Sequence, residues 1–224
     1  MSGRLSASKL TVHSGFNASC AKPRAMKSLS LLPLTALVAA AQPSADLTQV
    51  QRHLQALGTM TAAFTQTDRN GKALTGTLTM KQPGRIRFQY EKGVPILLVA
   101  DGGALTYIDY SVKQVQRWPV KNSPLGVLLD PSRDIGRFAT VVPTGNAQVI
   151  SVEARDPKHP EYGRITLVFA RDGGAPAGLA LQGWVALDSQ SNRTTVRLSN
   201  QRFGVPVSDT QFRWNDPRTT GGRR

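Results

Sequence analysis

The chain has 224 residues and a formal net charge of +14, from 28 lysines and arginines against 14 aspartates and glutamates. One cysteine rules out an intramolecular disulfide, and three histidines leave little material for metal or nucleophilic chemistry. The basic residues are scattered rather than clustered, so we expect no nucleic-acid partner but an affinity for an anionic surface or an acidic partner.

Residues 26–42 have the layout of a secretory signal peptide. Lys27 supplies the positive start, residues 29–38 form the apolar run, and three alanines at 39–41 supply a small-residue cleavage site. The run is too short to span a bilayer, which takes roughly 20 apolar residues. We therefore expect the working protein to be exported.

Residues 1–41 are expected to be a leader and signal peptide, with Met26 as the true start. Cys20 lies in this leader without an apolar run before it, so it predicts no lipid anchor. Residues 42–224 carry 23 basic and 14 acidic side chains, a net charge of +9. That length is sufficient for a single domain with a sizeable core and no disulfide.

The first element of this domain is an amphipathic helix. Its apolar residues recur at spacings of three and four, which places them on one face: Leu47, Val50, Leu54 and Leu57. Ser44 or Asp46 can cap the start by accepting hydrogen bonds from the first amides. Gly58 is a plausible end. His53 is expected to be a solvated residue of this helix.

After Gly58 the apolar period changes to two, which is typical of half-buried antiparallel strands. Asn70 and Gly71 mark a hairpin turn, because both tolerate positive φ. The alternation predicts strands at 61–67, 76–80, 85–90, 95–100, 104–110, 113–118, 148–154, 164–170, 178–187, 194–200 and 211–214. Between them, residues 124–142 predict two short helices, 124–129 and 131–138. Roughly ten strands with three helices predict a large curved antiparallel sheet.

The order of several short motifs resembles the outer-membrane lipoprotein carrier family, LolA. Phe64-Thr-Gln is followed by a Gly-x-Leu-x-x-Lys-x-Pro pattern at 76–83 and by the aromatic-ended strand 85–90. Asp101-Gly then precedes a second aromatic strand, and Ser-Pro-Leu follows at 123–125. The resemblance extends over residues 46–215.

The resemblance implies a mainly β (α+β) fold, an incomplete antiparallel half-barrel with a helical lid that encloses an apolar cavity. It implies a periplasmic, monomeric carrier. The shortage of histidine and cysteine separately leads us to expect no metal, cofactor or enzymatic activity. Such a carrier takes acylated lipoproteins from an inner-membrane transporter to an outer-membrane receptor. The alternatives are a half-barrel sensor or regulatory domain that binds lipid or lipoprotein, a carrier of other lipids, and, least favoured, an exported hydrolase.

The expected cavity and lid residues follow from the strand faces and from the resemblance. The expected acyl-chain cavity is lined by Leu78, Met80, Ile86, Phe88, Tyr90, Leu105, Tyr107, Leu167 and Phe169. The expected lid residues are Gln82, Leu125, Leu128, Leu129 and Phe138. Gln82 stands where family members often have an arginine that holds the lid closed. We expect Gln82 to make weaker, uncharged hydrogen bonds to the lid, with Arg85 or Arg87 as possible substitutes.

Overall fold

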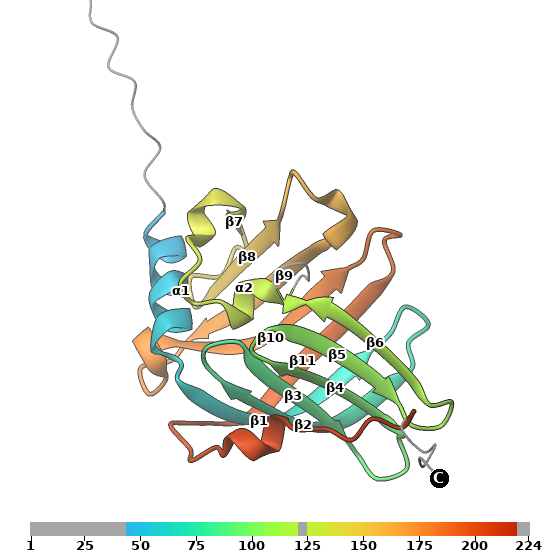
Figure 1. The fold of residues 1–224 in the computed structure, drawn as a ribbon. Helices are drawn as coiled ribbons and strands as arrows, with labels where there is room; N and C mark the ends of the chain where they lie inside the picture. Colours follow the sequence, from blue (N-terminus) through green and yellow to red (C-terminus); the bar gives the residue numbers. More distant parts are fainter. Residues whose placement is uncertain (1–43, 121–124, 219–224) are drawn as a thin grey trace, which may run out of the picture. The chain divides into compact units, whose positions relative to one another are not determined.

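An open antiparallel sheet of 11 strands forms most of residues 44–120 and 125–218, which are the residues that the computed structural model describes. The spatial order is β6-β5-β4-β3-β2-β1-β11-β10-β9-β8-β7, so β6 and β7 are edge strands and the sheet does not close (Figure 1). The strands are β1 (Thr59–Thr67), β2 (Ala73–Lys81), β3 (Arg85–Tyr90), β4 (Ile96–Asp101), β5 (Ala104–Asp109), β6 (Gln114–Pro119), β7 (Ala139–Val142), β8 (Val149–Arg155), β9 (Arg164–Arg171), β10 (Leu179–Leu187) and β11 (Arg193–Phe203).

Two α-helices and four short 3-10 helices accompany this sheet within the described residues. They are α1 (Ala45–Ala56), α2 (Gly126–Leu129), η2 (Ile135–Arg137), η3 (Pro160–Tyr162), η4 (Pro176–Gly178) and η5 (Asp209–Phe212). Ser44 caps α1 by accepting a hydrogen bond from the Leu47 amide at 3.2 Å. Asp46, the other expected cap, pairs instead with Arg171 at 2.5 Å. Across these described ranges, every helix is too short or too polar to cross a membrane.

The sheet has an inner face that packs against α1 and α2. Strand alternation puts Leu78, Phe88 and Leu98 on this face, because they are direct cross-strand partners. Their cluster includes Leu54 of α1 and Leu128 of α2. Two irregularities in the pairing, β1 with β11 and β9 with β10, are the kind of bulge that bends a sheet.

The outer face of β4 and β5 is covered by the segment after β11. Val207 and Phe212 of this segment are buried against Leu97, Val99 and Ile108. The same strands therefore have apolar side chains on both faces, one set under the helices and one set under the C-terminal segment. This two-sided burial explains why residues 96–101 form a nearly continuous apolar run.

The expected half-barrel of antiparallel strands is confirmed, one further strand was not expected, and two local expectations are wrong. Residues 139–142 form strand β7, because their backbone pairs with β8. The expected helix 131–138 reduces to the three-residue η2. The expected strand 211–214 is instead the end of η5 and an extended stretch, because Phe212 turns onto the outer face. The expectations for residues 1–41 lie outside the described residues.

Candidate functional site

The expected cavity residues come together on the inner face. Eight of them are buried in one continuous apolar cluster: Leu78, Met80, Ile86, Phe88, Tyr90, Leu105, Leu167 and Phe169. Tyr107 is on the same face, opposite Leu98, but is only half-buried. Their role in binding acyl chains stays a prediction.

Aromatic rings that sequence reasoning did not select complete this face. The Phe64 ring packs edge-on against the rings of Phe88 and Tyr90, with centroids 5.2 Å apart in each case. Trp184 packs edge-on against Phe88 at 5.9 Å. Gly76 makes room for this group, because a Cβ there would lie 2.8 Å from the Phe64 ring. The alternation of residues 62, 64 and 66 in the sequence could have placed Phe64 on the inner face.

Tyr90 is the polar group of this aromatic cluster. Its hydroxyl donates a hydrogen bond to Gln66 Oε1 at 2.9 Å. Burial raises the pKa of Tyr90 to about 12, and the nearby Tyr107 adds to the shift. The phenol is therefore neutral over the physiological range, and the inner face here stays uncharged.

The lid segment, residues 125–138, covers part of this face. Three leucines of this segment are buried in the apolar cluster: Leu125, Leu128 and Leu129. Phe138 is only half-buried, and the Arg133 guanidinium lies 4.5 Å above its ring. The lid segment thus contacts the inner face through α2 and Ile135, while Phe138 at its far end is partly exposed.

Two hydrogen bonds, which we call the latch, join the lid segment to the turn between β2 and β3. Gln82 Nε2 donates to the Leu128 carbonyl at 2.5 Å, and the Gly84 amide donates to the Leu129 carbonyl at 2.7 Å. These carbonyls belong to the last turn of α2, where helical partners run out. Gln82 therefore contacts the lid as expected; its gating role stays a prediction.

Arg85 and Arg87 do not substitute for Gln82 in the latch. Arg85 forms an ion pair with Asp209, and Arg87 donates to the carbonyls of Gln211 and Arg213 at 3.0 and 3.1 Å. Both side chains lie on the outer face, since alternation along β3 separates them from Ile86 and Phe88. The possibility that they hold the lid is therefore wrong.

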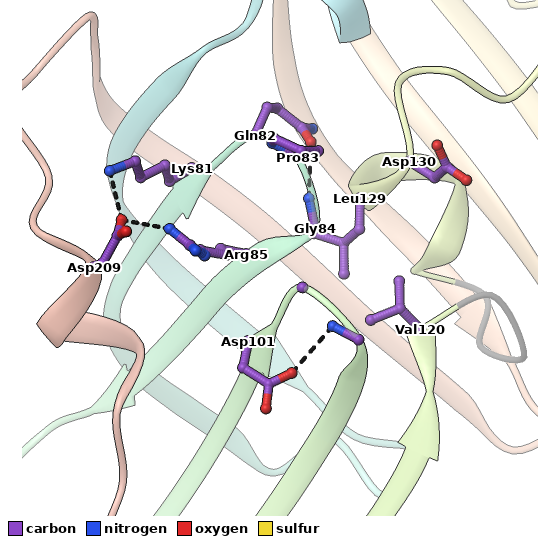
Figure 2. A pocket seen from close by; sticks show the side chains of 12 residues that line it. Lys81, Gln82, Pro83, Gly84, Arg85, Asp101, Val120, Leu129, Asp130 and Asp209 are labelled. Atoms are coloured by element: carbon purple, nitrogen blue, oxygen red, sulfur yellow. Dashed lines mark hydrogen bonds and ion pairs between the residues drawn. The ribbon is translucent and has the colours of Figure 1, made fainter.

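A cavity of about 750 Å³ lies beside the latch (Figure 2). Figure 2 shows Leu129 and Val120 on one side of it, and Lys81 and Arg85 turned toward Asp209 on the other. Hydrogen bonds from Lys81 and then Arg85 lower the pKa of the Asp209 carboxyl. The pocket thus has an apolar wall at the lid and a charged wall at the C-terminal segment.

Helix α1 holds the other end of the lid segment through Gln51. Its side-chain amide donates to the Pro131 carbonyl at 3.0 Å and accepts from the Ile135 amide at 3.1 Å. Sequence reasoning missed Gln51, because nothing in its sequence neighbourhood marks a polar helix residue as a contact to a segment 80 residues away.

His53 is the largest departure from the expected site. It is completely buried rather than solvated, and Nδ1 lies 2.9 Å from the Pro176 carbonyl, to which it donates as a neutral ring. Its ring packs edge-on against Phe169 at 5.4 Å. Burial lowers the pKa of His53, and the bond to Pro176 only partly opposes this. The helical period places His53 beside Val50 and Leu54 on the apolar face of α1, so its burial could have been predicted from the sequence.

The site contains no constellation for metal binding. Within residues 44–120 and 125–218, no three His, Cys, Asp or Glu side chains are grouped closely enough to hold a metal ion. What the arrangement provides is an apolar face under a segment held by a few hydrogen bonds. This defines an open antiparallel half-barrel with a short helical segment packed against its inner face.

The comparison with known families identifies that class further. Residues 55–215 match the family described as outer membrane lipoprotein carrier protein LolA, and the chain belongs to this family. An outer-membrane lipoprotein carrier protein of Chromobacterium violaceum is 28% identical over 191 residues, 81% of this chain and 88% of that protein. Its counterpart in Xanthomonas campestris is 26% identical over 160 residues, 66% of this chain and 72% of that protein.

Two further likenesses have a lower sequence identity. A protein of Rickettsia prowazekii, described as uncharacterized, is 25% identical over 122 residues, 53% of this chain and 57% of that protein. The solved LolA superfamily protein NE2245 from Nitrosomonas europaea aligns with 78% of this chain and 99% of its own, at 9% identity and a TM-score of 0.43.

Proposed function

We propose that this protein carries acylated lipoproteins across the periplasm, from an inner-membrane transporter to an outer-membrane receptor. The acyl chains would occupy the inner face of the sheet once the lid segment moves away. The observation that carries the proposal is a continuous apolar face, from Leu78 to Phe169, under a lid joined to the sheet turn by the two latch bonds.

The apolar face can supply the affinity that a carrier needs. Each methylene removed from water contributes roughly 0.8 kcal/mol. About 14 buried methylenes, roughly one long acyl chain, would contribute about 11 kcal/mol before the cost of opening the lid. An aromatic and methionine-containing surface such as Phe88 and Met80 suits chains of varied shape, because methionine repacks readily.

The latch suits reversible release. Gln82 is uncharged, so its bond to Leu128 contributes only about 1 kcal/mol, less than an arginine would. The latch therefore adds little to the cost of opening the lid, which depends mainly on exposing the buried leucines of α2. The role is therefore binding and transfer, with no bond made or broken in the cargo.

Release of lipoprotein from inner-membrane vesicles tests the proposal. The purified full chain should release a triacylated lipoprotein into the supernatant, and should leave behind the same protein anchored instead by a transmembrane helix. Release of both forms alike, or of neither by a folded chain, would reject lipoprotein carriage.

A pair of matched variants locates the cargo. Tyr107→Glu introduces a charge on the half-buried rim of the inner face, and we expect at least tenfold less bound lipoprotein. Tyr162→Glu, in η3, makes the same change away from that face and should leave binding within twofold. Equal binding by both variants would contradict the placement of the chains.

A further inference from the structure

A second pocket, of about 460 Å³, lies where two β-hairpins end side by side. The turn between β1 and β2 and the turn between β10 and β11 meet there, because β1 pairs with both β2 and β11. Thr67 and Thr195 are cross-strand partners in its wall, and Thr65 is the partner of Arg197. The wall is on the outer face, since Val196 between Thr195 and Arg197 points into the core.

Three arginines line this pocket, and the side chains of two of them have no partner among the described residues. The side chains of Arg193 and Arg197 are exposed and form no hydrogen bond or ion pair with any residue that the structure describes. Arg69 donates from Nη1 to Asn192 Oδ1 at 2.6 Å, which turns its guanidinium toward the second hairpin. Three like charges around one pocket repel each other unless an anion lies between them.

The two neighbouring carboxylates are engaged by their own turns. Asp68 accepts hydrogen bonds from the amides of Asn70 and Lys72 at 2.8 and 2.9 Å. Asp188 accepts from the Gln190 and Asn192 amides, and hydrogen bonds, first that of the Asn192 side chain, lower its pKa. Asp68 is the one carboxylate among the lining residues, so three arginines against it leave the pocket with an excess of positive charge.

Hydroxyl groups complete the donor set. Thr67, Thr195 and Ser191 line the same pocket as the arginines. Guanidinium groups with nearby hydroxyls match the geometry of tetrahedral oxyanions, since a guanidinium donates two parallel hydrogen bonds and a hydroxyl one more. The net charge of +9 on residues 42–224 would bring the chain toward any surface that displays such groups.

We propose that this pocket binds a phosphate group. The group is either the headgroup phosphate of a phospholipid or inorganic phosphate, which share the same chemistry. The pocket has no lining residue in common with the cavity beside the latch, so the proposal stands apart from lipoprotein carriage.

Titration of the ¹⁵N-labelled full chain with inorganic phosphate, at constant ionic strength adjusted with chloride, tests the site. We expect saturable shifts of the amides at 69–71 and 191–197. The double variant Arg193→Gln/Arg197→Gln should weaken the phosphate affinity at least tenfold. The matched double variant Arg52→Gln/Arg202→Gln removes two exposed arginines elsewhere and should change it less than twofold.

Co-sedimentation with vesicles distinguishes the two sources. If the headgroup is the ligand, vesicles with a quarter phosphatidylglycerol in phosphatidylcholine should pellet the parent chain and the Arg52/Arg202 variant, and several-fold less of the Arg193/Arg197 variant. If inorganic phosphate is the ligand, the pelleting of all three chains should be equal while the titration still separates them. Equal loss in both double variants, or no saturable shift at the pocket, would overturn the proposal.

Discussion

The hydrogen bond from Gln82 to the lid is the contact whose removal says most about the mechanism. Gln82→Ala removes the 2.5 Å bond to the Leu128 carbonyl and keeps the Gly84 amide bond to Leu129. A neutral hydrogen bond contributes about 1 kcal/mol net, and about 1.4 kcal/mol is a factor of ten. The equilibrium constant for lid opening should therefore rise about fivefold.

Gln82→Arg tests the same contact in the opposite direction. A charged donor strengthens the bond to about 2 kcal/mol, so lid opening should fall about fivefold relative to the parent chain. The two variants together should span about 25-fold in opening. A pure packing effect at this turn would instead move both variants the same way.

The measurement is the binding of a dye that fluoresces in apolar surroundings, followed by the rate of lipoprotein release from vesicles. Both should rise in Gln82→Ala and dye binding should fall in Gln82→Arg. Gln148→Ala, an exposed glutamine outside the lid, is the matched control. Unchanged dye binding and release in both position-82 variants would refute the latch.

Three other predictions concern stability. Because burial lowers the pKa of His53 below its ordinary 6.5, the unfolded chain binds a proton at this residue more readily than the folded chain. Urea titrations should therefore show the free energy of unfolding falling below pH 6.5, by up to about 1.4 kcal/mol per pH unit. His53→Gln should reduce this slope, and an unchanged slope would contradict the burial of the imidazole. Gly76→Ala should lower the unfolding free energy by about 1–3 kcal/mol, because its Cβ overlaps the Gln89 carbonyl oxygen; wild-type stability would contradict the close packing. Leu78→Ala should cost about 2–5 kcal/mol in the same titration, and a loss under 1 kcal/mol would mean that the inner face is not tightly packed.

Local patterning was enough to predict most of the elements. Alternation gave β3 its observed bounds, Arg85–Tyr90, and Ser44 was an expected cap of α1. Both features depend on neighbours within a few residues, where backbone geometry decides which side chains share a face. The residues on the inner face of the sheet could be predicted for the same reason, since alternation along each strand decides which side chains point to that face.

Errors arose where distant contacts overrode the local pattern. Residues 139–142 follow an apolar, interrupted segment and read as its continuation, yet pairing with β8 makes them a strand. Phe212 lies in the expected strand 211–214, yet it packs on the outer face instead of joining the sheet. His53 is polar by type, yet α1 turns it onto Phe169.

The sequence by itself determined the antiparallel β character, the opening helix and the composition of the inner face. Only the tertiary structure decided that β1 lies beside β11, that Gln82 rather than Arg85 meets the lid, and that Arg69 joins Arg193 in one pocket. Periodicity reports which side chains share a face of one element. Which elements become neighbours depends on summed contacts between residues far apart in the chain, and no local pattern contains that sum.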